Sequence, residues 1–456
     1  MIEYDSCLSV LKSMDERRRP EPREVSVYPL IIQVRCMTHT DADRFARDIR
    51  LSLRGSTTRI RYTGKASGYS THWSFTDDRL SSSVSSARRR YRQVSNRHRL
   101  EVSYWNDMPE YGNIEERPFI TFKVVISDER LHCDFLRRIH QRPDRLVRRY
   151  VYPAQQVDDS KYQWVTQGAR PIPRYPIYIV SKNRSDTRFT SRTLDAMGVP
   201  YRICIEPQDY DAYASVIDED KICVLPFSNH GLGSGPARNW CRDHAISLGA
   251  RRHWVLDDNI RGFFRLHLGR KLRVADASIF CHAENFVDRW SNVPLAGFAY
   301  TFQTLSSDLL PPFVLNTRCF SCVLLESSSE WTWRGRYNED LDLSLRILKA
   351  GQCTIQFNAF LQNKMSTQTM QGGNTTEFYA SEGTWKKSVM IKQLHPDVVD
   401  LVWRYGREHH YVAFRKRFRS NHLIPVDGSP ESQTLSPMIL RRLRRSKGTD
   451  RMSFQA

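Results

Sequence analysis

The stretch Arg252-His253-Trp254-Val255-Leu256-Asp257-Asp258-Asn259 is an apolar run that ends in two adjacent carboxylates and an amide. A short run of this kind is typical of a buried strand. The two carboxylates at its end would repel each other unless a cation lay beside them. A Mg²⁺ or Mn²⁺ ion, which prefers oxygen ligands, is the simplest such cation. The alternative is a turn whose polar side chains are solvated.

Three more strands are predicted upstream of this one, and a helix follows each of them. The strands cover residues 175–181, 201–205 and 222–225, and the helices cover residues 190–197, 210–216 and 236–248. This alternation predicts an α/β domain with a mostly parallel, Rossmann-like sheet and right-handed crossovers. Because such sheets bind ligands beyond the carboxyl ends of their strands, we expect Asp257 and Asp258 in the binding site.

A second acidic element, Tyr337-Asn338-Glu339-Asp340-Leu341-Asp342-Leu343-Ser344-Leu345-Arg346, begins a predicted helix. Its apolar face runs through Leu341, Leu345 and Leu348. The helix dipole stabilises carboxylates at an N-terminus, so an ordinary capped helix is one interpretation. The other interpretation makes one carboxylate a general base that deprotonates an acceptor hydroxyl.

The segment His230-Gly231-Leu232-Gly233-Ser234-Gly235-Pro236-Ala237-Arg238-Asn239 joins a glycine-rich loop to the start of a helix. Backbone N–H groups at a helix N-terminus favour anions, so this segment is a candidate cradle for phosphates or a nucleotide. It is not a P-loop, because no Gly-Lys-Ser/Thr follows, and it is a weak dinucleotide-binding fingerprint.

The 456 residues carry a formal net charge of +19, from 69 Lys and Arg against 50 Asp and Glu. Residues 1–170 contribute +9, residues 171–400 contribute +2, and residues 401–456 contribute +8. The excess at the two ends is either a solvated basic surface or a contact for nucleic-acid phosphates. The candidate DNA-binding residues are Arg88, Arg89, Arg90, Arg415, Lys416 and Arg417.

We expect three parts along the chain. Residues 1–170 are predicted to form an α+β domain that ends in a proline-containing linker, with strands at 28–34 and 119–126 and helices at 41–53 and 129–139. Residues 171–400 form the α/β domain, and residues 401–456 form a basic extension, with a helix predicted over 398–418. No apolar run is long enough for a transmembrane helix, and the N-terminus lacks the features of a signal peptide. We therefore expect a cytoplasmic protein.

Together these elements resemble the GT-A fold of nucleotide-sugar glycosyltransferases over about residues 175–365. More narrowly, the chain is similar to the TET-associated glycosyltransferases of phages. The matching stretches are Tyr-Ile-Val-Ser-Lys-Asn-Arg, Gly-Pro-Ala-Arg-Asn-Trp, Trp-Val-Leu-Asp-Asp-Asn-Ile and Tyr-Asn-Glu-Asp-Leu-Asp-Leu-Ser-Leu-Arg. The resemblance implies transfer of a sugar from a UDP-sugar, such as UDP-glucose, to 5-hydroxymethylcytosine in DNA. It also implies a functional link to a TET-type dioxygenase, which makes the hydroxymethyl group, and a location in the cytoplasm of the host cell if a phage encodes the protein.

The resemblance also implies roles for individual residues. The donor would be held by Ser181, Asn183, Arg184, Arg238, Asn239 and Asp257. A Mn²⁺ or Mg²⁺ ion would lie at Asp258 and Asn259, with His395 as a further ligand, although the family pattern often has an acid where this chain has Asn259. Asp340 would be the catalytic base with Glu339 supporting it, and a single base of this kind implies inversion at the anomeric carbon.

Two other functions fit the same residues. One is a GT-A glycosyltransferase with a glycan or protein acceptor, and the other is a DNA-binding protein with an inactive transferase domain. Trp331 and Trp333 either stack on a sugar or base or belong to the core, and residues 368–376 are polar and predicted to close over the donor as a lid.

Overall fold

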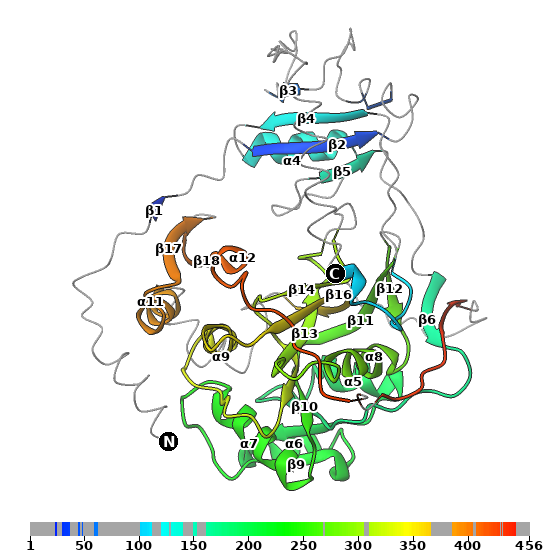
Figure 1. Cartoon of the computed structure of the whole chain (residues 1–456), viewed down its shortest axis with the longest axis vertical. Coiled ribbons are helices and arrows are strands. Elements are labelled where there is room, and N and C mark those ends of the chain that lie inside the picture. Colours follow the sequence, from blue (N-terminus) through cyan, green and yellow to red (C-terminus); the bar gives the residue numbers. More distant parts are fainter. Residues whose placement is uncertain are drawn as a thin grey trace.

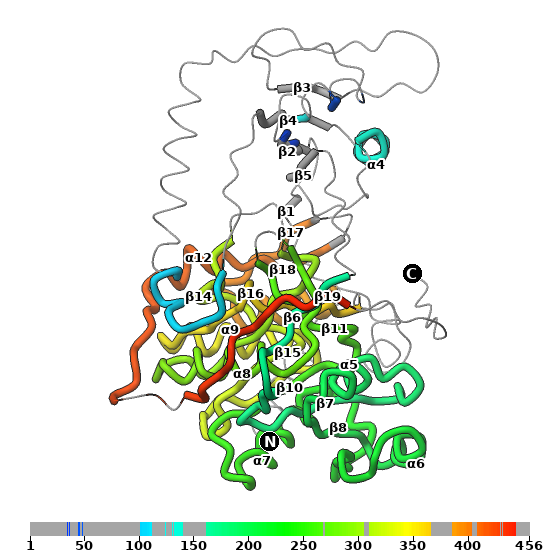
Figure 2. Tube along the Cα trace, turned by 90° about the vertical axis from the view of Figure 1, so that its right-hand side faces the viewer, coloured from blue at the N-terminus to red at the C-terminus, as the bar shows by residue number. Residues whose placement is uncertain are grey.

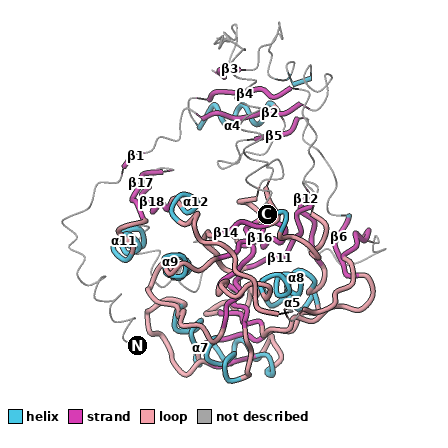
Figure 3. The backbone as a smooth tube through the Cα atoms, in the orientation of Figure 1, coloured by secondary structure: helices cyan, strands magenta, loops and turns pink. Residues whose placement is uncertain are grey.

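The structure is a computed structural model of the chain. It describes residues 23–24, 30–36, 44–45, 48, 59–62, 101–111, 120–126, 129–139, 149–152, 161–267, 270–304, 310–365, 385–404, 407–428, 430 and 432–443. Its main body is one large mixed sheet flanked by helices (Figures 1 and 3).

The main sheet has twelve described strands in the order β19-β6-β12-β11-β16-β13-β15-β10-β7-β8-β9, with β14 paired to β16. Eight of these strands run in one direction, and β11, β14, β15 and β19 run in the other. The predicted mostly parallel α/β sheet is therefore confirmed.

The part predicted as alternating strands and helices forms a continuous parallel block. Its strands are β7 (Ile177–Val180), β8 (Arg202–Ile205), β9 (Ile222–Val224) and β10 (Arg252–Asp257). Its helices are α5 (Phe189–Met197), α6 (Tyr210–Ala214) and α7 (Gly235–Ser247), with 3₁₀ turns η2 (Pro207–Asp209) and η3 (Glu219–Lys221). Since β8 lies on one side of β7 and β10 on the other, the strand order reverses at β7. Such a switch point is where open α/β sheets bind ligands.

The two faces of this block have separate cores, because alternate residues of a strand point to opposite faces. Ile177, Ile179 and Trp254 pack with α5 and with α8 (Ser278–Val287). Tyr178 and Val255 pack instead with α7 and with α9 (Glu339–Lys349). The two helical layers hold the sheet rigid beneath the loops at the carboxyl ends of its strands.

The sheet continues beyond β10 through strands that follow in the sequence. They are β11 (Ile260–His267), β12 (Arg270–Val274), β13 (Leu295–Tyr300), β14 (Phe313–Leu315), β15 (Cys322–Glu326) and β16 (Thr354–Lys364). Strand β15 lies between β10 and β13 and is antiparallel to both. Helix α11 (Trp385–Leu394) packs beside α9.

The N-terminal region contains a separate four-stranded sheet in the order β3-β4-β2-β5. Its elements are β2 (Leu30–Cys36), β3 (Arg59–Tyr62), β4 (Ile120–Ile126), β5 (Arg149–Tyr152) and α4 (Glu129–Arg138), which lies on one side of it (Figure 2). Phe135, Leu136 and Ile139 are buried, as the predicted apolar face requires. The segment around Trp105, by contrast, packs against Phe286, Phe313 and Phe360 of the main core.

Two boundaries differ from the sequence prediction. Strands β6 (Tyr162–Thr166) and β19 (Met438–Arg442) both belong to the main sheet and pair with each other, although they lie outside the predicted range 171–400. The helix predicted over 398–418 is wrong. This stretch forms β17 (Val399–Arg404), β18 (Arg407–Val412) and the short helix α12 (Phe414–Arg417).

The physical reason is that β-branched Val399, Val402 and Val412 favour extended backbone, and β17 and β18 pair as antiparallel neighbours. Strand β1 (Arg23–Glu24) adds to the edge of β17. None of the described helices is long and apolar enough to cross a membrane.

Candidate active site

Loops at the carboxyl ends of β7, β8, β9, β10 and β16 surround a cavity of about 400 Å³. This volume lies within the range typical of small-molecule sites. The glycine-rich loop before α7 and the start of α9 also line it. The cavity therefore lies at the switch point of the sheet, and it brings together the three motifs that the sequence analysis singled out.

Asp258 lies beneath this cavity in a buried polar cluster. Its Oδ1 is 2.5 Å from Nη1 of Arg184, and its Oδ2 accepts a 2.7 Å hydrogen bond from the hydroxyl of Ser181. Burial raises the pKa of Asp258 above its usual value, while Arg184 and Ser181 offset part of that shift. The end of β7 and the end of β10 are thereby joined through side chains.

Asp257 pairs with two cations from distant parts of the chain. Nη2 of Arg238 donates to Oδ1 at 2.8 Å, and Nζ of Lys364 donates to Oδ2 at 2.6 Å. Burial opposes ionisation of this carboxyl, but Lys364 and Arg238 more than compensate and hold its pKa well below the usual range. Asp257 is therefore ionised at neutral pH.

Asp340 shares Arg238 with Asp257. Nη1 of Arg238 lies 2.5 Å from Oδ1 of Asp340, while Oδ2 has no hydrogen-bond partner among the residues that the structure describes. Burial raises the pKa of Asp340 to about 7; Arg238 opposes this rise, and the carboxylates of Glu339 and Asp257 add to it. A buried carboxylate with one unbonded oxygen and a pKa near neutrality has the properties of a general base.

Glu339 and the glycine-rich loop before α7 also line the cavity. The hydroxyl of Ser234, the residue before α7, donates a 2.6 Å hydrogen bond to Oε1 of Glu339. Gly233 has a φ of +71°, and a Cβ atom there would lie 2.7 Å from the carbonyl oxygen of Arg336. Only glycine fits this close approach, which lets the loop run along the cavity and end at the N-terminus of α7.

The residues of this site, as arranged, do not fit a metal ion. The carboxylate oxygens of Asp257 and Asp258 are already bonded to Arg184, Arg238, Lys364 and Ser181. Within the described ranges, no group of three or more His, Cys, Asp and Glu side chains is arranged to hold a metal. Asn259 does present a buried Oδ1 without a hydrogen-bond partner. The positive charge that the two carboxylates require is supplied here by side chains.

Several predicted residues lie outside the cavity. His395 is buried and its Nε2 is 2.9 Å from Asp342, which Arg334 and Arg346 also bind, so the ring is part of a buried ion-pair network. Both polar atoms of the Asn239 amide bond the backbone of Trp333. Asn183 uses its backbone N–H to bind Asp209 and does not line the cavity.

The remaining predictions divide in the same way. Trp333 is buried in the core and carries the guanidinium of Arg238 over its ring at 4.5 Å, so it positions that arginine. Arg415, Lys416 and Arg417 form α12 and are exposed. Arg88, Arg89 and Arg90 and the predicted lid at 368–376 lie outside the described residues.

The residues that line the cavity and that sequence reasoning missed include Lys364, Ser321, Tyr300 and Phe302. Lys364 ends β16, and Ser321 precedes β15 with a φ of +62°, an unusual value for a residue other than glycine. Neither stands in a motif, and only the pairing of β16, β13 and β15 brings them to the site. The one available signal was a polar residue at the end of an apolar strand.

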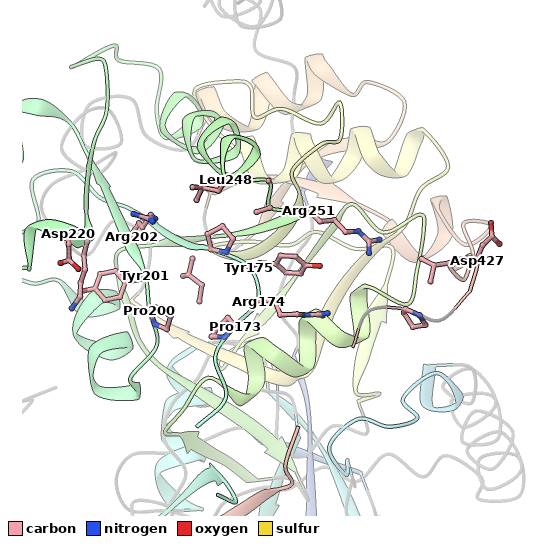
Figure 4. Close-up of a pocket in the computed structure, with 17 residues that line it drawn as sticks. Pro173, Arg174, Tyr175, Pro200, Tyr201, Arg202, Asp220, Leu248, Arg251 and Asp427 are labelled. Atoms are coloured by element: carbon pink, nitrogen blue, oxygen red, sulfur yellow. The ribbon is translucent and has the colours of Figure 1, made fainter. Parts of the chain in front are cut away.

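A larger hollow of about 1080 Å³ lies at the opposite, amino ends of β7, β8 and β10 (Figure 4). Two of its cations are paired with acids. Arg174 binds Asp288 at 2.8 Å, and Lys221 binds Asp218 at 2.9 Å. Because it faces away from the strand ends that carry the motifs, the smaller cavity is the candidate active site.

The parallel block, its switch point and the carboxylates around the cavity define an α/β domain of the GT-A type. Residues 175–373 match the family described as TET-Associated Glycosyltransferase. The chain is therefore a glycosyltransferase, and residues 175–373 are the part that matches this family.

One solved structure with similarity to the chain comes from Desulfovibrio desulfuricans G20 and is described as a nucleotide-diphospho-sugar transferase. It is 10% identical in sequence, with a TM-score of 0.26, and the match covers 49% of this chain and 99% of the other. No curated protein sequence matches the chain.

Proposed function

We propose that this protein transfers a sugar from a UDP-sugar to the hydroxyl group of 5-hydroxymethylcytosine in DNA. The observation that carries the proposal is Asp340, whose carboxylate combines a raised pKa with an unbonded oxygen in the cavity. The DNA acceptor is supported by the resemblance to the TET-associated glycosyltransferases of phages and by the net charge of +19. In this proposal, a TET-type dioxygenase supplies the hydroxymethyl group. The donor and the acceptor DNA meet in the cytoplasm.

In the proposed reaction, Oδ2 of Asp340 takes the proton of the acceptor hydroxyl. The hydroxyl oxygen forms a bond to the anomeric carbon while the bond from that carbon to the diphosphate oxygen breaks. Nucleoside diphosphate leaves with the electron pair. Attack opposite the leaving group gives inversion, so a product with retained configuration would refute the role of Asp340 as sole base.

The negative charge of the leaving diphosphate has favourable surroundings in this cavity. The N-terminus of α7 presents backbone N–H groups, and Lys182, Arg184, Arg238 and Lys364 all line the wall. Preorganised positive groups of this kind stabilise charge that grows in the transition state. The Mg²⁺ or Mn²⁺ ion at Asp258 and Asn259 stays a prediction, and no step of the proposed reaction depends on it.

The proposed DNA contact includes the exposed residues Arg415, Lys416 and Arg417 of α12. Replacing two of these charges should lower both DNA affinity and its dependence on salt, since each phosphate contact releases counterions. Replacement of Arg192 and Arg251, which are exposed elsewhere on the surface, is the matched control.

The direct test is to incubate the protein with hydroxymethylated DNA and a panel of UDP-sugars, and then to identify the nucleosides by mass spectrometry. A hexose added to 5-hydroxymethylcytosine supports the proposal. Transfer to a glycan or protein but not to DNA would replace the acceptor, and DNA binding without any turnover of nucleotide sugar would indicate an inactive transferase domain.

A further inference from the structure

Three aromatic rings form a parallel stack along one wall of the active-site cavity. The rings of Tyr300 and Phe302 have centroids 4.9 Å apart and an interplanar angle of 12°. The ring of Phe320 lies on Tyr300 at 6.4 Å and 13°, and the guanidinium of Arg318 lies over Phe320 at 5.4 Å. The four flat groups are thus linked by successive contacts, and Phe302 is the last member of the series.

The end of this series is exposed at the cavity. Phe302 is 43% exposed, although it is a large apolar side chain, and it lines the cavity together with Tyr300, Phe320 and the carboxylate of Asp340. An exposed ring that continues an ordered stack offers a free π-face at the next stacking position.

Hydrogen bonds connect this stack to the charged centre. The hydroxyl groups of Tyr300 and Ser321 are 2.8 Å apart, and Nζ of Lys364 donates to the same Ser321 hydroxyl at 2.8 Å. Lys364 in turn binds Asp257. The orientation of the stack is therefore tied to the groups that surround Asp340, and a ligand held on Phe302 has a defined position relative to the base.

The order of the strands assigns the stack to the acceptor rather than to the donor. Tyr300 ends β13 and Phe302 follows it, whereas Ser181 and Glu206 follow β7 and β8 in the parallel block, where nucleotides bind. Asp257 and Asp258 at the end of β10 lie between these two ends of the cavity. The donor nucleotide and the aromatic stack are thus on opposite sides of the reacting centre.

We propose that Phe302 is the platform on which the acceptor base stacks after it has left the DNA helix. This inference rests on the proposed function. Every nucleobase has a flat face that stacks on an aromatic ring. The side chain of Asp340 is only 13% exposed, so a base that stays within a duplex cannot bring its hydroxyl group to this carboxylate. Gln303 lines the same cavity, and its amide offers donors and an acceptor for the Watson–Crick edge that the base exposes.

The test compares two DNA duplexes that differ only at the target position. One carries 5-hydroxymethylcytosine there, and the other carries an abasic site. Equilibrium binding of each duplex is measured for the wild type, for Phe302→Ala and for Phe302→Trp. The control is Ile246→Ala on α7, because Ile246 is also 43% exposed and does not line the cavity.

We expect Phe302→Ala to bind the base-containing duplex roughly 10-fold more weakly, which is within the range for loss of one stacked base. Binding of the abasic duplex should change less than about 2-fold, Phe302→Trp should resemble the wild type, and Ile246→Ala should change neither. The inference would be overturned if Phe302→Ala weakened binding of both duplexes equally, or if it weakened neither. It would also be overturned if the wild type bound the two duplexes with the same affinity.

The outcome is distinguishable from failure of the proposed function. If the wild type adds no sugar to 5-hydroxymethylcytosine but Phe302→Ala still weakens only the base-containing duplex, the platform stands and the reaction is wrong. If Phe302→Ala leaves DNA binding intact and instead weakens transfer to an oligosaccharide, the stack holds a sugar and the inference is refuted.

Discussion

Nζ of Lys364 lies 2.6 Å from Oδ2 of Asp257, although 107 residues separate them in the chain. With Arg238 on the other oxygen, this contact surrounds a strand-end carboxylate with two cations, of which Arg238 is buried and Lys364 is half-buried. The same lysine binds the hydroxyl of Ser321, so it joins the charged centre to the wall that carries the aromatic stack.

Replacement of Lys364 should therefore impair catalysis. In Lys364→Met, Asp257 loses one of its two cations and the leaving diphosphate loses a nearby positive charge, so we expect kcat to fall about 100-fold, as for loss of a preorganised electrostatic group. Lys364→Arg retains the charge and should retain most activity. Steady-state kinetics with both variants checks this, and equal losses in the two would show that the role of Lys364 is not its charge.

Replacement of the proposed base should separate chemistry from donor binding. Asp340→Asn has nearly the same shape but cannot accept the proton, so we expect kcat to fall by about 10²-fold to 10⁴-fold. Affinity for the UDP-sugar, measured by calorimetry, should change little. Full activity in this variant would refute the assignment, and Glu339→Gln should lose less than Asp340→Asn because Glu339 only supports it.

The pH dependence of the reaction should report Asp340. Its pKa is raised to about 7, chiefly by burial, and only the ionised form can take a proton. We therefore expect kcat/KM to rise with pH through about 7 and to be low at pH 5. A profile that stays flat between pH 5 and pH 8 would contradict a base with this pKa.

Treatment with a chelator tests whether side-chain cations or the predicted metal ion neutralise Asp257 and Asp258 during catalysis. Because Arg184, Arg238 and Lys364 already pair with Asp257 and Asp258, we expect transfer to continue in the presence of EDTA. If EDTA abolishes transfer and Mn²⁺ restores it, then Asp258 exchanges Arg184 for a metal ion, as the motif at Asp257-Asp258-Asn259 predicts. Arg184→Gln should make that exchange easier and lower the Mn²⁺ concentration required.

The network around Asp342 should govern acid stability. Burial opposes ionisation of Asp342, but His395 and Arg334 more than compensate and lower its pKa to about 2. A carboxylate with a depressed folded pKa contributes stability that is present above its ordinary pKa and is lost as pH falls through the folded value. We therefore expect the free energy of unfolding to fall between about pH 4 and pH 2.

Asp342→Asn removes this contribution at neutral pH, and loss of one partner in a buried ion pair typically costs about 3–5 kcal/mol. Denaturant unfolding at pH 7 and at pH 3 measures both effects. A variant as stable as the wild type at pH 7 would show that the network contributes nothing.

The sequence alone was sufficient for features that depend on near neighbours in the chain. The alternation of strands and helices from Ile177 to Asp257 follows from apolar periodicity, and the apolar face of α9 follows from the spacing of its leucines. Placement of Asp257 and Asp258 at the ligand-binding edge follows as well, because parallel strands bring their carboxyl ends to one side.

The tertiary structure alone decided which charges meet. The motif predicted a cation beside Asp257 and Asp258, but it could not show that the partners are Arg184, Arg238 and Lys364. Likewise, the sequence left His395 as a candidate metal ligand, whereas in the structure its ring contacts the carboxylate of Asp342. Such pairs depend on the order of strands in the sheet and on which helix covers which face. Those arrangements are set by burial of whole faces rather than by local pattern. For this reason Phe302 carries no sequence signal of its own, and Lys364 has only its position at the end of an apolar strand.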